Sequence, residues 1–420
     1  MFWEISRYFF YGWIDELYIK QDFHFKYEWF TWIESLPGSW MYIVFGLLGL
    51  TSLMISLGWF YRIATILFCL TYTYVFLIDQ AYYNNHFYLI IIFSGLMIIT
   101  PLHHAWSLDV KAGRIKHIET MPAFWLWLMR FPMTLVYVYG SIAKMQPDWL
   151  SGKATTGLLG KANQGTVLEP LIQFEWISLF YAWSGMLFDL LIPFAMLWKK
   201  TRLIAFLSAL LFHGNNFLVF QIGVFPLLSI ALTLLYFDAD FAKNLLPLFL
   251  KQRLIPLFSS KSHKKTNHII SGPQPILKAT IAIFIAIQLI LPFRHLLYPG
   301  KTLWHEEGHY FAWRMMLRQK EIGIKLNVKN PLTQETRYAD PRDYLNSSQY
   351  RTFAGNPEMI LLFVHHLGEL IQKNGGFKAE IFSEIWVGLN GRKPKLLTDP
   401  QLNLLSVPKY TPSYLWIYHH

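Results

Sequence analysis

The chain has 420 residues, of which 54% are hydrophobic, 18% aromatic and only 15% charged. Soluble domains rarely combine so much apolar sequence with so few charges, so the composition excludes an ordinary soluble protein and predicts a polytopic membrane protein. The formal net charge of +11 falls mostly in short loops between apolar runs, where the positive-inside rule accounts for it without a nucleic-acid partner. The single cysteine, Cys69, allows no intrachain disulfide and supports neither a Cys-based zinc site nor a cysteine nucleophile.

Residues 1–298 predict an all-α polytopic membrane domain. Its first segment, Ile5 to Ile19, is either a short first span or an interfacial helix, because Arg7 and two acidic residues interrupt its apolar residues. Eight apolar stretches follow, several of them shorter than the ~20 residues that a straight span needs. We therefore expect about eight or nine transmembrane helices. The stretches are Met41 to Leu57, Ile63 to Ile78, Phe87 to Thr100, Ala123 to Ala143, Ile177 to Trp198, Leu203 to Phe220, Ile222 to Phe237 and Ile276 to Leu297.

Basic residues in alternate loops predict the orientation of the chain. The positive-inside rule places the basic loops in the cytoplasm. The segment from Lys144 to Trp176 and everything after Tyr298 should then be extracytoplasmic. The basic loop residues are Lys111, Arg114 and Lys116, then Lys199, Lys200 and Arg202, and then the run from Lys243 to Lys265.

Residues 299–420 are more polar and predict a small extracytoplasmic α+β module. Apolar residues alternate with polar ones from Ile322 to Val328, which favours a strand. From Pro357 to Lys373 the apolar residues recur at helical spacing. A second strand is predicted from Ile381 to Leu389, and Asn390-Gly391 after it is a hairpin signal.

Four polar clusters interrupt the apolar spans. Polar groups at membrane depth cost several kcal/mol unless they have partners, so these clusters are candidate functional sites. Each also allows an ordinary structural role: Lys144 could snorkel to the interface, His104 could cap a helix, and His213 could be satisfied by helix packing. The clusters are Asp79 with Asn84-Asn85-His86, His103-His104-Ala105-Trp106-Ser107-Leu108-Asp109, Lys144 with Asp148-Trp149, and Asp189 with His213-Gly214-Asn215-Asn216.

Taken together in chain order, these residues resemble the vitamin K-dependent gamma-glutamyl carboxylase family. The resemblance covers nearly the whole chain, from Arg7 to Thr398-Asp399-Pro400. The short chain and lone cysteine suggest a bacterial homologue, because animal members are longer and contain a disulfide. The resemblance rests on Tyr74-Val75-Phe76-Leu77-Ile78-Asp79, Asn84-Asn85-His86, His104-Ala105-Trp106-Ser107-Leu108-Asp109, Lys144-Met145-Gln146-Pro147-Asp148-Trp149, Phe188-Asp189-Leu190 and Ile385-Trp386-Val387.

The resemblance implies a carbon–carbon lyase coupled to epoxidation of reduced vitamin K, with oxygen and carbon dioxide as co-substrates. Lys144 matches the family's base for the hydroquinone, and an apolar site would favour the neutral amine that this role needs. His104 matches a histidine that stabilises developing charge. In the family, oxygen converts the deprotonated hydroquinone into a strong base that takes the γ-proton of a glutamate, and the resulting carbanion is carboxylated as the epoxide is released. A water-excluded cavity protects these species.

Further site residues and partners follow from the same resemblance. Asn85, His86, His213 and Asn216 are expected around the cofactor. The glutamate-binding stretch of animal members aligns with Lys301 to Trp313, and its candidate substrate-binding residues here are Trp304, Tyr310 and Trp313. Expected partners are the lipid bilayer, which is the inner membrane if the protein is bacterial, and a glutamate-containing protein or peptide. A quinone reductase is a further candidate partner, and no metal is expected.

Alternatives from several classes stay open. The substrate stretch retains little of the animal sequence, which leaves an epoxidase without peptide carboxylation. His305-Glu306-Glu307-Gly308-His309 fits H-E-x-x-H, a zinc-hydrolase motif on a helix, although its glycine weakens a helix and no third ligand is evident. The polar clusters could also line a transport path or belong to a non-catalytic lipid- or quinone-binding protein.

Overall fold

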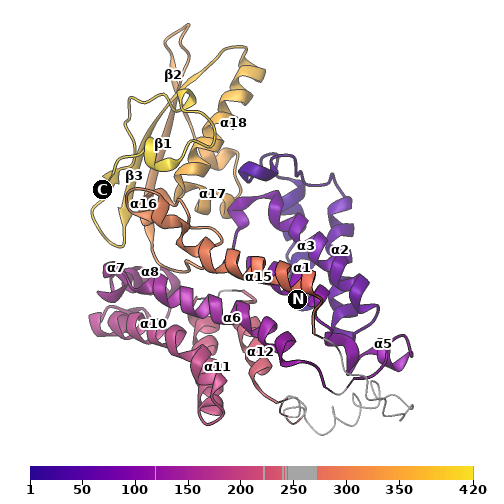
Figure 1. The fold of residues 1–420 in the computed structure, drawn as a ribbon. Coiled ribbons are helices and arrows are strands. Elements are labelled where there is room, and N and C mark those ends of the chain that lie inside the picture. The colour runs from indigo at the N-terminus through magenta and orange to yellow at the C-terminus, as the bar shows by residue number, and fades with distance from the viewer. Residues whose placement is uncertain (119, 221–222, 239–240, 242–243, 245–271, 420) are drawn as a thin grey trace.

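The computed structural model describes residues 1–118, 120–220, 223–238, 241, 244 and 272–419 (Figure 1). Apart from Asn244, the predicted basic loop from Lys243 to Lys265 therefore lies outside the described residues. Helices dominate the described chain before residue 299, and a small sheet with its own helices follows. The predicted mostly helical fold with a C-terminal α+β region is confirmed.

Every predicted apolar stretch is helical over most of its described length. Among the residues that the structure describes, five helical segments are long and apolar enough to cross a membrane, which supports a membrane protein, but the predicted count of eight or nine spans is not confirmed. The five are α2 (Trp40–Leu57), α3 (Tyr61–Ile78), α10 (Glu175–Leu197), α11 (Arg202–Phe220) and α15 (Pro275–Ile290) with its continuation η6 (Leu291–Leu297). The other stretches form α4 (Asn85–Ile99), α6 (Ala123–Lys144) and α12 (Phe225–Thr233), which continues into η5 (Leu234–Tyr236).

The ambiguous first segment forms two short pieces. Helix α1 (Phe2–Phe10) ends at Tyr11, and a single π-helical turn, η1 (Asp15–Ile19), follows. Nine α-helical residues rise only about 14 Å, so α1 is too short to cross a bilayer on its own. Its buried Glu4 pairs with Arg7 at 2.9 Å, and this ion pair lets α1 pack against α2.

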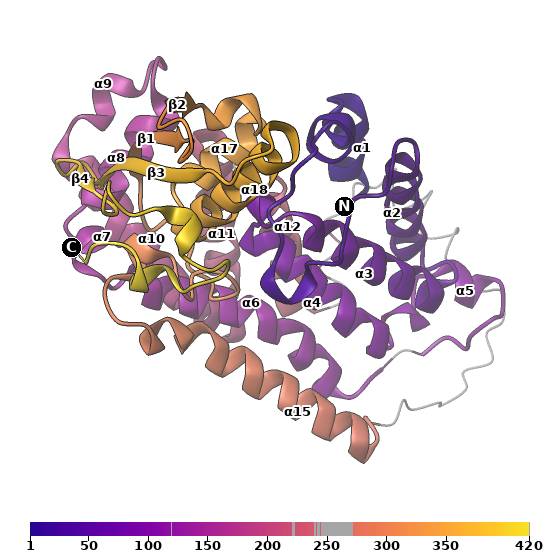
Figure 2. The same cartoon turned by 90° about the horizontal axis from the view of Figure 1, so that it is seen from above.

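The helices form two groups around separate apolar cores. Helices α1 to α4 pack in sequence around residues such as Met41, Phe45 and Leu48. Helix α6 packs against α10, which packs against α11, and α15 runs along the edge of this group (Figure 2). Further short α-helices before residue 275 are α5 (Leu108–Lys111), α7 (Pro147–Leu150), α8 (Lys153–Asn163) and α9 (Glu169–Ile172).

The C-terminal region contains a four-stranded antiparallel sheet in the order β2-β1-β3-β4. The predicted strands, long helix and hairpin are confirmed, and Asn390 and Gly391 adopt the positive φ angles of a tight turn. Apolar residues of the long helix, among them Phe363, pack with inward residues of the sheet such as Ile385. The elements are α16 (Thr302–His305), β1 (Lys320–Lys329), β2 (Thr336–Ala339), α17 (Ser347–Ala354), α18 (Pro357–Gly375), β3 (Glu380–Leu389) and β4 (Lys395–Leu396).

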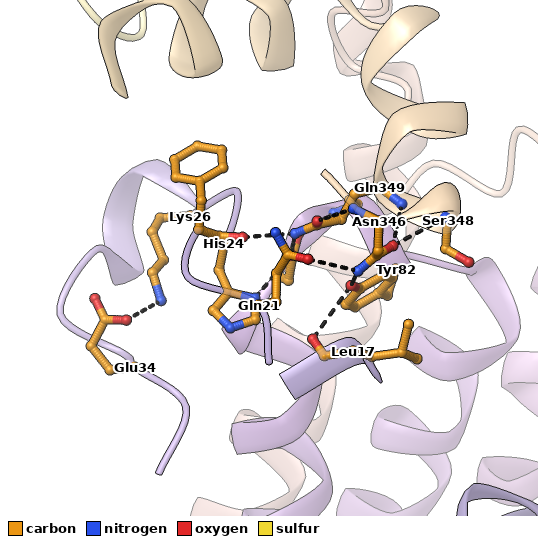
Figure 3. A network of polar contacts seen from close by, with 12 residues as sticks. Leu17, Gln21, His24, Lys26, Glu34, Tyr82, Asn346, Ser348 and Gln349 are labelled. Atoms are coloured by element: carbon orange, nitrogen blue, oxygen red, sulfur yellow. Dashed lines mark hydrogen bonds and ion pairs between the residues drawn. The ribbon is translucent and has the colours of Figure 1, made fainter. Parts of the chain in front are cut away.

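The sheet region shares its core and a buried polar network with the helices. Ala154 and Ala182 of the helical part belong to the same apolar cluster as Phe363. The fully buried carboxylate of Asp79 lies 3.1 Å from the Nδ1 atom of His24 and accepts a hydrogen bond of 2.8 Å from Gln349 of α17. Figure 3 shows His24 and Gln349 in this network, together with Asn346, which donates a 2.7 Å hydrogen bond to the hydroxyl of Tyr82. These contacts hold α17 against the end of α3, so the orientation of the sheet region is set by the helices. The predicted division at residue 298/299 stays a prediction.

Candidate active site

A cavity of about 450 Å³ lies between the helices and the sheet region. This volume falls within the range of typical small-molecule sites. The predicted residues Asn85, His86, Lys144, His213 and Asn216, which are far apart in the sequence, all line it. The structure therefore brings together five of the predicted site residues, and Tyr310 is a sixth.

Lys144 is the last residue of α6, because the chain turns immediately afterwards. Gln146 is extended, as expected before a proline, and Pro147 opens α7. The side chain of Lys144 pairs with the carboxylate of Asp189 on α10, and these residues are only 8% and 5% exposed. The Trp149 indole covers the ammonium group from 5.4 Å. The lysine therefore faces the cavity as half of a buried ion pair instead of snorkelling to water.

Aromatic and polar side chains of the membrane helices form one end of the cavity. The hydroxyl of Tyr137 and the Nε2 atom of His213 lie 2.8 Å apart, whereas the buried Nδ1 atom of His213 has no hydrogen-bond partner among the described residues. The ring of Phe225 lies 5.8 Å from His213 and 5.9 Å from His86. This end combines flat apolar surfaces with a free polar atom, a combination that suits an aromatic ligand carrying oxygen atoms.

The part of the cavity lining contributed by the C-terminal region is strongly basic. Asp189 is the only acidic residue among the described residues that line the cavity. Behind the wall, Glu306 binds Arg318 and Lys320. Burial would raise the pKa of Glu306, but the two neighbouring cations outweigh burial and hold it at about 2. Burial also lowers the pKa of Lys320 to about 8. The basic lining residues are Lys144, Lys161, Arg314, Arg318, Lys320 and Arg351.

The chain between α16 and β1 forms the basic wall in an unusual backbone conformation. Phe311, Trp313 and Met316 have φ angles of 57°, 55° and 52°, and Glu306 has 64°. Each such non-glycine residue costs about 1–3 kcal/mol and persists only where surrounding contacts hold it. One of these contacts is a 2.7 Å hydrogen bond from the Phe311 backbone N–H to the hydroxyl of Tyr83. Strained segments of this kind cluster at functional sites.

His104 does not lie in this cavity. It occupies a 3₁₀ turn beyond the far end of α4, and its Nδ1 atom lies 3.0 Å from the backbone oxygen of Lys116. Helix α4 begins at the cavity with Asn85 and rises about 22 Å over its 15 residues before the chain reaches this turn. This location does not fit the expected role of His104 as an electrostatic partner of Lys144, because the length of a helix lies between them.

Two predicted substrate residues are core residues. Trp313 is fully buried and stacks on Tyr88 with ring centroids 5.1 Å apart, and Trp304 belongs to the apolar core of the sheet region. Neither residue lines the cavity. Tyr310 does line it, and its hydroxyl accepts a 2.9 Å hydrogen bond from Asn356. Aromatic character in the sequence did not distinguish a packed indole from one facing a ligand.

The zinc alternative lacks the helix on which its geometry depends. Helix α16 ends at His305, and Glu306 adopts a left-handed conformation. Its carboxylate, which would be the base of a zinc hydrolase, is occupied by two cations. No group of three potential metal ligands is present among the described residues.

Several cavity residues were either given no specific role or missed in the sequence. Asp189 belonged to a polar cluster without an assigned partner, and its pairing with Lys144 across 45 residues has no local signal. Arg314, Arg318 and Lys320 had one usable signal, which is their density in a short segment next to the predicted substrate stretch.

The helices and this cavity define an integral membrane protein with a site shared by its helical and C-terminal parts. The family model of the HTTM domain matches residues 1–241, and that of the vitamin K-dependent gamma-carboxylase lumenal domain matches residues 273–420. The chain belongs to the vitamin K-dependent gamma-carboxylase family, and the second match indicates an extracytoplasmic C-terminal region. No solved structure matches the chain.

Proposed function

We propose that the protein is a vitamin K-dependent gamma-glutamyl carboxylase in which Lys144 is the base for reduced vitamin K. The observation that carries this proposal is the buried pair of Lys144 and Asp189, which faces a cavity between membrane helices and the carboxylase lumenal region. A lipid quinone reaches such a position from the bilayer, and a peptide reaches it from the extracytoplasmic side.

The cavity residues fit a reduced quinone. Phe212 and Phe225 offer aromatic faces, and the unpartnered Nδ1 atom of His213 can bond a quinol oxygen. Asn85 and Asn216 supply further amide groups from two helices. Bound reduced vitamin K supplies, on reaction with oxygen, the strong base that abstracts the γ-proton of glutamate before carbon dioxide adds and the epoxide leaves.

Asp189 gives Lys144 a route to its neutral form. The Asp189 carboxylate contacts the Lys144 Nζ atom directly, so it can accept one of the ammonium protons without an intervening water. The resulting amine accepts the hydroquinone proton. General-base catalysis contributes about 10²–10⁴-fold, and the low exposure of the pair keeps water from competing for that proton.

The first test is vitamin K epoxide formation by the purified protein in detergent, measured with labelled carbon dioxide incorporation into a glutamate peptide. We expect both products, and we expect Lys144→Ala to lower epoxide formation about 10²–10⁴-fold. Lys153→Ala, at an exposed lysine of α8 outside the cavity, is the matched control.

Full epoxide formation by Lys144→Ala would remove Lys144 as the base. Epoxide formation without labelling of the peptide would indicate an epoxidase that does not carboxylate peptides. If a folded wild-type sample formed neither product, the result would favour a transporter or a non-catalytic quinone-binding protein.

A further inference from the structure

Arg314 is a buried cation without a hydrogen-bond or ion-pair partner in the described part of the chain. Its side chain lines the cavity and is only 8% exposed. Its Nε atom is buried without a hydrogen bond, and the guanidinium makes no hydrogen bond or ion pair with any residue that the structure describes. An unpaired buried charge costs several kcal/mol, so the site favours an anion that comes from outside the chain.

The nearest carboxylate cannot serve as that anion. Glu306 accepts two hydrogen bonds from Arg318 and one from Lys320. These two cations occupy both of its oxygens, and Arg314 feels its charge without bonding to it. Arg318 and Lys320 therefore neutralise Glu306, and Arg314 is the cation of this segment that is available to a ligand.

Packing on both sides holds Arg314 in place. The buried indole of Trp313 stacks on Tyr88, and the amide of Asn85 lies 3.5 Å from the backbone oxygen of Arg314. The next residue, Met315, reaches helix α6 at Gly140, where the carboxylate of Asp189 also lies. The guanidinium is thus presented from a fixed backbone that passes beside the Lys144–Asp189 pair.

We propose that Arg314 binds the γ-carboxylate of the glutamate substrate. This inference rests on the proposed carboxylase function. The planar guanidinium can hold a carboxylate through two parallel hydrogen bonds, which orients the adjacent γ-carbon as well as binding it. Loss of the γ-proton adds a second negative charge beside that carboxylate, and a fixed cation stabilises this charge as it develops.

The test measures binding of an end-blocked peptide that carries one glutamate, with the same peptide carrying glutamine as the reference ligand. Wild-type protein should bind the glutamate peptide at least about tenfold more tightly. Arg314→Gln should abolish this preference, and Arg314→Lys should retain part of it because the charge remains. Arg342→Gln, at an exposed arginine paired with Asp340 away from the cavity, should keep the wild-type preference.

Melting temperature separates a binding role from a structural one. Because Arg314→Gln removes an unpaired buried charge, it should melt no lower than wild type. A wild-type preference in Arg314→Gln, or no preference in wild-type protein, would overturn the proposal.

Epoxide formation without peptide distinguishes the two proposals. Epoxide from a wild-type protein that does not prefer glutamate would overturn the Arg314 assignment alone. A glutamate preference without epoxide would support Arg314 and contradict the role of Lys144.

Discussion

The two walls of the cavity differ in how they treat polar groups. On the membrane side, regular helices pair polar groups with one another, such as Lys144 with Asp189 and the hydroxyl of Tyr137 with the Nε2 atom of His213. On the extracytoplasmic side, an irregular strained segment presents an excess of cations and leaves Arg314 without a partner among the described residues. The difference suggests that the first wall tunes groups for proton transfer, whereas the second is prepared to receive an anion.

The largest expected effect comes from breaking the pair on the membrane wall. Asp189→Asn leaves the buried Lys144 ammonium without its counter-ion and should cost about 3–5 kcal/mol of stability as well as epoxide formation. Melting temperature and epoxide yield measure the two effects. The double variant Lys144→Met/Asp189→Leu should regain much of the stability without regaining activity, since it removes both charges. If the single variant melts like wild type, the pair is not a buried one.

A smaller effect should come from the strained segment between α16 and β1. At Gly308, with φ of +71°, an added Cβ would lie 2.6 Å from the Cα atom of His295. Gly308→Ala should therefore cost about 2–4 kcal/mol from backbone strain and overlap, and should weaken glutamate-peptide binding.

The matched control is Gly391→Ala in the hairpin. Gly391 has a φ of +73°, but an added Cβ there meets no atom within 4 Å, so only the strain of about 1–2 kcal/mol remains. Equal melting temperatures for the two variants would show that the approach to His295 is not tight.

The smallest effect is a pH dependence on the extracytoplasmic side. Burial, together with the nearby Glu307, raises the pKa of Glu358 at the start of α18 to about 7. The folded state then binds a proton that the unfolded chain releases near pH 4.5, so this group destabilises the fold as pH rises from about 4.5 to 7. When the pH is raised from 5 to 8, the melting temperature of Glu358→Gln should fall by a few degrees less than that of wild-type protein. Identical losses would contradict the raised pKa of Glu358.

The sequence predicted local structure well where one periodicity dominated. The strand ending at Leu389, the turn at Asn390-Gly391 and the helix beginning at Pro357 were all found, because their patterns are local. It also singled out Lys144, His86 and His213, which all line the cavity, since polar groups within apolar runs need a reason to be there. The number of spans was less certain, because short helices such as α4 match the hydrophobic pattern of a membrane span but are shorter than a span needs to be.

What the sequence by itself determined was the membrane character, the family and the polar residues that require partners. Only the tertiary structure decided which partners they have. It paired Lys144 with Asp189 and Glu306 with two cations, and it placed His104 a helix length away from the cavity. It also left Arg314 without a partner in the part of the chain that the structure describes. Hydrophobic pattern and motif order are properties of neighbouring residues, whereas charge compensation in a cavity depends on which distant segments the fold brings into contact.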